Sequence, residues 1–234
     1  MRLDKYLVDT SECTRTQAKQ YIKQGRISVN GETIKRPEFK LDENNDIICL
    51  DNKRLSYSKY EYYMLNKPAG YVSATEDLRD KTVISLIDST KRDLFPVGRL
   101  DKDTEGLLLI TNNGELAHNL LSPKKHVDKK YYAKVKGIIT DAEIKRFHDG
   151  IRINDDFTTL PAKLEIIKSD MVSEVYVTIR EGKFHQIKKM FIALGMEVIY
   201  LKRISMKNLV LDNSLSLGEY RALTEKEIEE LFEA

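Results

Sequence analysis

Tryptophan is absent from this 234-residue chain, and cysteine occurs only as Cys13 and Cys49. Neither cysteine has a second cysteine or a histidine at zinc-ligand spacing, so we expect two buried thiols and no metal site. No apolar run approaches the about 20 residues that a membrane helix needs, and MRLDKYLVDT lacks the apolar segment of an export signal. These absences predict a soluble, cytoplasmic protein with no membrane partner.

Glycine-rich phosphate-binding motifs are missing as well. Neither GxxxxGK[ST] nor GxGxxG occurs in the chain, which argues against nucleotide-driven chemistry and against a dinucleotide cofactor. The formal net charge is only +2, although 32% of the residues are charged. A protein this close to neutral does not coat nucleic acid through its overall charge, so any basic surface must be local.

The first 58 residues contain such a local positive charge. Within residues 1–41, nine Lys and Arg against five Asp and Glu leave a net charge of +4. Helical spacing predicts a helix from about Thr14 to Gln24. Three cations spaced by four fall on one stripe of that helix: Arg15, Lys19 and Lys23. An RNA-facing surface and an ordinary solvated helix face are both compatible with this stripe.

A short hairpin is predicted to follow that helix. Asn30-Gly31 separates two extended runs, and this dipeptide is the strongest local signal for a two-residue hairpin turn. Polar residues then lead to a domain boundary that we place near Ser58, which gives predicted domains at residues 1–58 and 59–234.

The larger domain is predicted to combine strands and helices irregularly. Capping boxes begin helices at Thr140 and Thr224, and HQIKKMFIALG has apolar residues at helical spacing. Strands are predicted in EYYML, which we expect to end before Asn66, and in LLLIT, KKYYAKVK and SEVYVTI. This order predicts an α+β fold: a small N-terminal helix-and-hairpin domain, then a larger domain on a mixed, largely antiparallel sheet flanked by helices.

The segment GRLDKDTEGLLLITNNG, residues 98–114, places three acids beside a glycine. Its first half matches a calcium loop, but position 12 is Asn112 instead of glutamate, and LLLIT suits a buried strand, so we expect no metal. A polar turn that merely precedes a strand is a second interpretation. In a third, Arg99 and Asp101 project to the same side of an extended segment, where the carboxylate would stay ionised for chemistry. Spacing does not decide between the last two.

Resemblance to a known family favours the catalytic interpretation. GRLDKDTEGLLLITNNG resembles the signature of pseudouridine synthases of the small-subunit rRNA type (the RsuA family), as do YYMLNKPAGYVSA, KKYYAKV and REGKFHQIKKMFIALG in the same order. RLDKYL and TRTQAKQYIKQGRISVNGETIKRP resemble the S4 RNA-binding module.

The resemblance implies an enzyme that isomerises one uridine of 16S rRNA to pseudouridine on a flipped-out nucleotide. The C1′–N1 bond breaks, the uracil turns and a C1′–C5 bond forms, so no cofactor is required. We expect a monomer that acts on 16S rRNA within a 30S assembly intermediate, while the sequence leaves open the oligomeric state and the choice between naked rRNA and a ribonucleoprotein substrate. The alternatives are the same reaction on 23S rRNA and a noncatalytic S4-type RNA-binding or ribosome assembly factor.

The same resemblance assigns roles to individual residues. Asp101 is the catalytic carboxylate, and whether it attacks C1′, adds to the base or removes a sugar proton stays open. Tyr131 lies against the flipped base unless the strand register shifts by one and Tyr132 takes its place. Lys188 pairs with Asp101, and Arg99 fills the space that the uridine leaves.

Further contacts follow from the matching motifs. Leu201 is expected to pack beneath the base. The remaining substrate or RNA contacts implied are Lys67, Lys183, Gln186, Lys189, Arg15, Lys19 and Lys23. A lysine-rich run with tyrosines, residues 122–137, predicts a path for the RNA backbone. No role is assigned to the histidines, because none has a partner at metal-ligand spacing.

Overall fold

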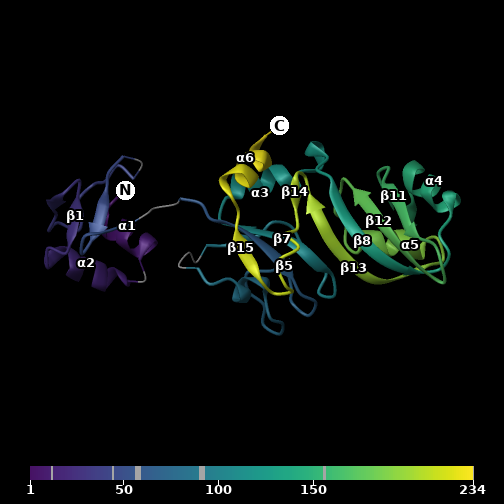
Figure 1. Cartoon of the computed structure of the whole chain (residues 1–234), viewed down its shortest axis with the longest axis horizontal. Coiled ribbons are helices and arrows are strands. Elements are labelled where there is room, and N and C mark those ends of the chain that lie inside the picture. The colour runs from purple at the N-terminus through teal and green to yellow at the C-terminus, as the bar shows by residue number, and fades with distance from the viewer. Residues whose placement is uncertain (12, 44, 56–58, 90–92, 155–156, 234) are drawn as a thin grey trace. The chain divides into compact units, whose positions relative to one another are not determined.

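The computed structural model describes residues 1–11, 13–43, 45–55, 59–89, 93–154 and 157–233. The chain divides into two compact units, which are Met1–Tyr60 with Asp88–Asp93, and Glu61–Ile87 with Leu94–Ala234 (Figure 1). The boundary predicted near Ser58 lies outside the described residues. Across the described part of the chain, none of the helices has the length and apolar character of a membrane-spanning segment.

The first unit packs two helices on a small antiparallel sheet. Its elements are α1 (Leu3–Thr10), α2 (Arg15–Lys23), β1 (Ile27–Val29), β2 (Glu32–Thr33), β3 (Ile48–Leu50) and β4 (Lys53–Arg54), with the strand order β2-β1-β3-β4. Thr14 and Gln17 form a reciprocal capping box that begins α2. The predicted hairpin is confirmed: Val29 pairs with Glu32, and Asn30 and Gly31 both have positive φ, as a type I′ turn requires.

The two faces of α2 differ in burial. Ala18 and Ile22 are fully buried against the core of this unit, whereas the three cations of the predicted stripe are exposed: Arg15, Lys19 and Lys23. The sequence pattern therefore gives the correct faces for this helix.

The second unit is built on one large sheet, confirming the predicted α+β class. Its strands are β5 (Tyr62–Lys67), β6 (Phe95–Pro96), β7 (Glu105–Thr111), β8 (Lys129–Lys136), β11 (Lys163–Lys168), β12 (Val172–Ile179), β13 (Glu197–Met206), β14 (Leu209–Val210) and β15 (Tyr220–Ala222). The order is β11-β12-β8-β13-β7-β5-β15, with β14 on β13 and β6 on β7. In the described residues β7 and β13 pair in parallel, and the other pairs of this sheet are antiparallel. The shorter β9 (Arg152–Asn154) and β10 (Phe157–Thr158) pair separately.

Helices cover the sheet in two groups (Figure 1). The helical elements are η1 (Val83–Leu86), α3 (Gly114–Leu121), η2 (Pro123–Lys125), α4 (Asp141–Asp149), α5 (Gln186–Ile192) and α6 (Glu225–Phe232). One hydrophobic core contains buried residues of α4 and α5, and the other contains buried residues of α3 and α6. Strand β7 supplies Leu108 and Ile110 to the first core and Leu107 and Leu109 to the second. Because neighbouring strand residues point to opposite faces, the two helix groups lie on opposite faces of β7.

Gly106 allows the parallel strand to approach this central position. It pairs with Arg203 of β13, and a Cβ added to Gly106 would lie 2.2 Å from the Arg203 carbonyl oxygen. Gly106 also has a φ of +99°, which L side chains rarely adopt. The glycine thus fixes where β7 begins, directly after the loop that carries Asp101.

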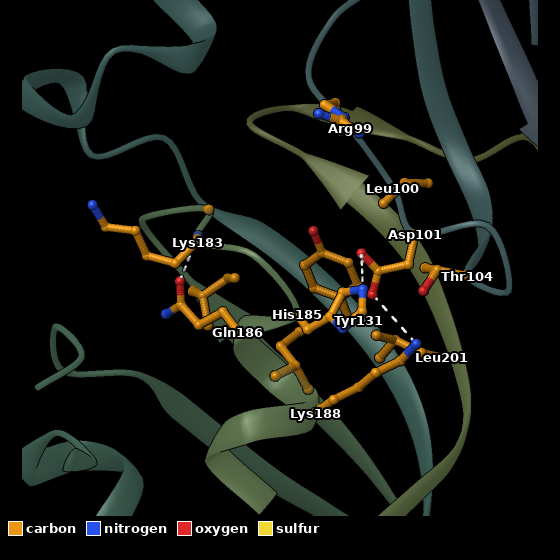
Figure 2. A pocket seen from close by; sticks show the side chains of 13 residues that line it. Arg99, Leu100, Asp101, Thr104, Tyr131, Lys183, His185, Gln186, Lys188 and Leu201 are labelled. Carbon is orange, nitrogen blue, oxygen red and sulfur yellow. Dashed lines mark hydrogen bonds and ion pairs between the residues drawn. The ribbon is translucent and has the colours of Figure 1, made fainter. Parts of the chain in front are cut away.

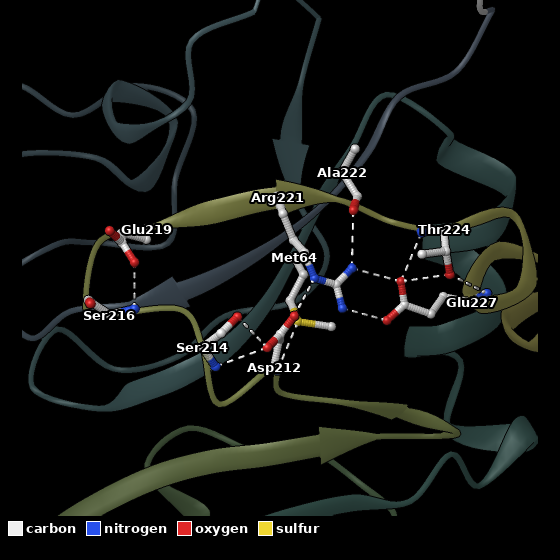
Figure 3. A network of polar contacts seen from close by, with 9 residues as sticks. All are labelled: Met64, Asp212, Ser214, Ser216, Glu219, Arg221, Ala222, Thr224 and Glu227. Atoms are coloured by element: carbon white, nitrogen blue, oxygen red, sulfur yellow. Dashed lines mark hydrogen bonds and ion pairs between the residues drawn. The ribbon is translucent and has the colours of Figure 1, made fainter.

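A charged network ties the C-terminal helix to the sheet (Figure 3). Arg221 of β15 donates from Nη1 and Nη2 to the two Glu227 carboxylate oxygens at 2.8 and 2.7 Å, and from Nε to Asp212 at 2.7 Å. Hydrogen bonds from Ser214 and Arg221 lower the pKa of Asp212 to about 2. Hydrogen bonds from Arg221 and Thr224 outweigh burial and lower the pKa of Glu227 to about 2.

We predict that Arg221→Leu lowers the free energy of unfolding by about 1–3 kcal/mol, because two charge-assisted contacts are lost. Both carboxyls have folded-state pKa values below their ordinary values near 4. Their contribution is therefore complete above about pH 4.5 and disappears as the pH falls toward 2. Thermal unfolding between pH 2 and 7 should show a shallower acid dependence in the variant.

The control Arg180→Leu removes one exposed pair, with Asp128, and should cost under about 1 kcal/mol. Equal losses from the two variants would contradict this account.

Candidate active site

A pocket of the second unit lies where the loop before β7, strands β8 and β13, and the start of α5 converge (Figure 2). The three residues predicted to be catalytic all line it: Asp101, Tyr131 and Lys188. The fold thus brings together residues that stand 30 to 87 positions apart in the chain.

The Asp101 carboxylate sits between two basic side chains. Its Oδ2 lies 3.3 Å from Lys188 Nζ, and its Oδ1 lies 3.6 Å from His185 Nε2. The Asp101 side chain is 23% exposed, so it is accessible from the pocket but shielded on its other sides. Across the described residues, no group of three His, Cys, Asp or Glu side chains is arranged to hold a metal ion.

Lys188 is shared between two carboxylates. Its Nζ donates to Asp103 Oδ1 and Oδ2 at 2.6 and 2.8 Å, closer than its contact with Asp101. Burial lowers the pKa of Lys188, but the hydrogen bond to Asp103 and the charges of both acids outweigh burial and raise it. Lys188 therefore remains charged beside Asp101. Asp103, two residues after Asp101, anchors this cation.

Tyr131 and Tyr132 point to opposite faces of β8. Tyr131 is 7% exposed and lines the pocket, whereas the Tyr132 hydroxyl donates to Glu174 on the other face. Tyr131 pairs across the sheet with Arg203, so Leu201 is its diagonal neighbour on β13 and lines the same pocket. The expected register therefore places Tyr131, and not Tyr132, at the site.

Lys67 lies beneath the pocket and not at its surface. The resemblance implies that it binds substrate, but the structure corrects this, because the residue is fully buried. Its Nζ donates to the main-chain carbonyls of Thr104 (2.8 Å), Pro68 (3.0 Å), Asp101 (3.1 Å) and Lys102 (3.3 Å). Burial lowers the pKa of Lys67 to about 8, against the opposing effect of the acids nearby. Strand β5 therefore continues through Lys67 instead of ending before Asn66.

Two further contacts hold the Asp101 loop against the segment after β5. Ser73 Oγ donates to the Leu100 carbonyl at 3.0 Å and accepts from the Leu100 amide at 3.1 Å. The Gly70 amide donates to the Lys102 carbonyl at 2.7 Å. The segments YYMLNKPAGYVSA and GRLDKDTEG are therefore one structural unit, in which the first supports the second.

Gln186 is a support for the neighbouring turn. It is 4% exposed, its Oε1 accepts from the Lys183 amide at 3.0 Å and its Nε2 donates to Glu181 at 2.9 Å. Gln186 also lines the pocket, so its implied substrate contact stays a prediction beside this supporting role. Lys183 itself is exposed and lines the pocket, and Lys189 is half-buried on α5.

Arg99 is exposed at the edge of the pocket (Figure 2). The sequence suggests that the Arg99 guanidinium lies beside the Asp101 carboxylate. In the described residues, that carboxylate instead forms its ion pairs with Lys188 and His185. An exposed guanidinium at the pocket edge remains available to RNA.

His185 is the residue at this site that sequence reasoning missed. It precedes α5 in a left-handed conformation with a φ of 53°, and its ring lines the pocket beside Asp101. Histidine is one of the residues that tolerate this conformation. Its position three residues before Lys188, at a helix start, was the available signal, because such residues share a side.

The lysine-rich run of residues 122–137 does not form one surface. Lys129 is buried, with its Nζ donating to the Val127 carbonyl at 3.0 Å. Lys130 and Lys136 lie on the opposite face of β8 from Tyr131 and pair with Glu165 and Glu197. Burial removes Lys129 from the predicted RNA path, and Lys130 and Lys136 are on the face of β8 turned away from Tyr131 and the pocket.

Comparison with known proteins identifies the family of this chain. The family model described as RNA pseudouridylate synthase matches residues 61–193, and the S4 domain matches residues 1–47. The chain belongs to the RNA pseudouridylate synthase family and carries an S4 domain at its N-terminal end. It is accordingly an enzyme, an RNA pseudouridine synthase.

Individual relatives match over nearly the whole chain. YtzG of Bacillus subtilis (strain 168), an uncharacterized RNA pseudouridine synthase, is 44% identical over 97% of both chains. The ribosomal small subunit pseudouridine synthase A of Escherichia coli (strain K12) is 37% identical over 97% of this chain and 98% of its own. A crystal structure of a pseudouridylate synthase matches with a TM-score of 0.70 and 37% identity over 99% of both chains.

Proposed function

We propose that this enzyme converts one uridine of 16S rRNA to pseudouridine and that Asp101 carries the chemistry. The observation that supports this most is the Asp101 carboxylate, which lines the pocket between the charged Lys188 and the imidazole of His185. Asp101 is the one carboxylate among the described residues that line this pocket, and Figure 2 shows it beside the Tyr131 ring.

The reaction needs the groups that this pocket provides. Breaking C1′–N1 leaves an electron-poor sugar, which a carboxylate can stabilise or trap, as in glycoside hydrolysis. The uracil then turns, C1′ joins C5, the C5 proton leaves and N1 gains a proton, so atoms and electrons balance. Tyr131 provides an aromatic surface for the base, and Leu201 lies beside it on the same face. Lys188 holds the carboxylate in place during these steps.

The target nucleotide must leave the RNA stack to enter the pocket, at a cost of a few kcal/mol. Arg99 is suited to fill the vacated position, because a planar guanidinium stacks on bases. Its exposure at the pocket edge supports this role. The exposed Lys183 is placed to contact the RNA backbone at the same edge.

The choice of 16S rRNA is supported by relatives named for the small subunit. Besides the E. coli enzyme, the ribosomal small subunit pseudouridine synthase A of Vibrio parahaemolyticus is 41% identical over 99% of this chain and all of its own. We propose that the protein acts as a monomer on a 30S assembly intermediate.

The test is to incubate the protein with unmodified 16S rRNA, 23S rRNA and partly assembled 30S particles, and to map pseudouridine by mass spectrometry. We expect one new pseudouridine in 16S rRNA, formed faster in the particle. Modification of 23S rRNA alone would contradict the proposed substrate.

The S4 unit is proposed to supply phosphate contacts through its α2 stripe. We predict that the combined change Arg15→Gln, Lys19→Gln and Lys23→Gln weakens binding to 16S rRNA about tenfold at 0.1 M salt. The slope of log affinity against log salt concentration should become less steep by about 2, because three fewer phosphates are neutralised and fewer counterions are released on binding. Filter binding between 50 and 300 mM salt measures both.

The matched control removes three exposed lysines of the second unit: Lys163→Gln, Lys168→Gln and Lys226→Gln. It changes the net charge by the same amount and should leave the salt slope within about 0.5 of the unmodified protein. If both variants lower the slope equally, the stripe has no special part in RNA binding.

A further inference from the structure

Phe184 is a large aromatic side chain that the fold leaves in solvent. It is 71% exposed, although burying a phenylalanine is worth about 1.5–3 kcal/mol. It lies in the turn between β12 and α5, directly between Lys183 and His185, which both line the pocket. Because both of its neighbours line the pocket, the exposed Phe184 ring lies where the substrate would bind, which indicates contact with the substrate.

The turn holds Phe184 outward by fixed contacts. Gln186 binds both main-chain groups of Lys183. Its side-chain Oε1 accepts from the Lys183 main-chain amide at 3.0 Å, and its main-chain amide donates to the Lys183 carbonyl at 3.1 Å. Gln186 Nε2 donates to Glu181, whose carboxylate also accepts from the Leu160 amide at 2.8 Å. Lys183 before Phe184 and Gln186 two residues after it are therefore anchored, and the Phe184 ring is presented without a large ordering cost on binding.

The surroundings of the ring suit a nucleic acid. The Phe184 ring stacks on the His185 imidazole, with centroids 3.7 Å apart and an interplanar angle of 21°. Lys189 Nζ lies 5.1 Å from the ring centroid, and Lys183 is exposed on the same turn. The same imidazole reaches Asp101 at 3.6 Å, so a base stacked on Phe184 would lie next to the nucleotide in the pocket.

We propose that Phe184 stacks on a base of the substrate RNA that neighbours the target uridine, with Lys189 beside the adjoining phosphate. This inference rests on the proposed function and adds a positioning residue to it. Base–aromatic stacking tolerates any base and depends on a flat ring, so Phe184 contributes affinity and placement of the strand and not the chemical step.

The absence of tryptophan allows a direct test. Phe184→Trp carries the protein's single indole, whose fluorescence is quenched when a nucleobase stacks on it. In the Asp101→Asn background, which binds without turnover, titration with 16S rRNA should quench this fluorescence. Met171→Trp is the control: this exposed residue precedes β12, at the opposite end of the strand from the pocket-lining Ile179. It should show no quenching.

Substitutions then separate stacking from bulk. Phe184→Ala should raise the Kd for 16S rRNA about 5- to 100-fold and raise KM with kcat nearly unchanged. Phe184→Tyr should restore both values, and Phe184→Leu, which is apolar but not flat, should not. The melting temperature should stay unchanged in all three, because the ring is exposed.

Affinity unaffected by Phe184→Ala together with an unquenched Phe184→Trp would overturn the proposal. If the unmodified protein makes no pseudouridine in 16S rRNA, the proposed function fails instead.

Discussion

Replacing Asp101 by asparagine is expected to lower kcat at least about 1,000-fold while the Kd for RNA stays within about threefold. The amide keeps the size of the carboxylate but cannot supply its charge or act as a nucleophile or base, and losses of this size are usual for such groups. Phosphate contacts supply most of the RNA affinity, and they lie elsewhere. Single-turnover pseudouridine formation and filter binding on the same preparation measure the two effects.

Asp103→Asn is the matched control, because it removes the same charge from the same loop. The Asp103 side chain is 73% exposed and contacts Lys188, so this change should release Lys188 toward Asp101 and cost only about 3- to 10-fold in kcat. A larger loss from Asp103→Asn than from Asp101→Asn would mean that the two acids have exchanged roles.

Lys67→Met is expected to lower kcat about 100-fold with little change in stability. The Asp101 and Thr104 carbonyls lose their common donor, and a misplacement of about 1 Å at a reacting group costs about this much. The effect on unfolding is smaller because two contributions oppose each other. The pKa of Lys67, lowered to about 8, corresponds to a cost of about 3 kcal/mol for burying the charge, which methionine removes. The lost hydrogen bonds offset most of this gain.

Lys102→Met provides the comparison in the same loop. Lys102 is half-exposed, and its Nζ reaches only the Asp80 carboxylate among the described partners, at 2.6 Å. We expect its kcat to remain within about twofold of the unmodified protein. If Lys67→Met behaved like Lys102→Met, the ammonium would not be what positions the Asp101 loop.

Much of the fold could be predicted because its signals are local. Thr140 and Thr224 each form the expected capping box, and Asn30-Gly31 forms the expected turn. Alternation along SEVYVTI correctly identifies the buried face of β12. These features depend on neighbouring residues, so short-range patterns are sufficient to find them.

The supporting contacts of the site could not be predicted in the same way. A lysine ahead of Pro-Ala-Gly looks like the exposed end of a strand, and the carbonyls that satisfy Lys67 lie as far as 37 residues along the chain. His185 has no metal-ligand partner by spacing, and its contact with Asp101 spans 84 residues of sequence. In the sequence, Gln186 looks like any polar residue. Its supporting hydrogen bonds to the Lys183 amide and to Glu181 depend on how the turn folds.

The central claim is that Asp101 in this pocket makes pseudouridine in 16S rRNA. The most direct measurement is a complete pseudouridine map of rRNA from cells lacking the gene, after supplying either the unmodified protein or the Asp101→Asn variant. We expect one 16S uridine that is converted only when the unmodified protein is supplied. Conversion of that uridine by the Asp101→Asn variant, or a new pseudouridine confined to 23S rRNA, would contradict it.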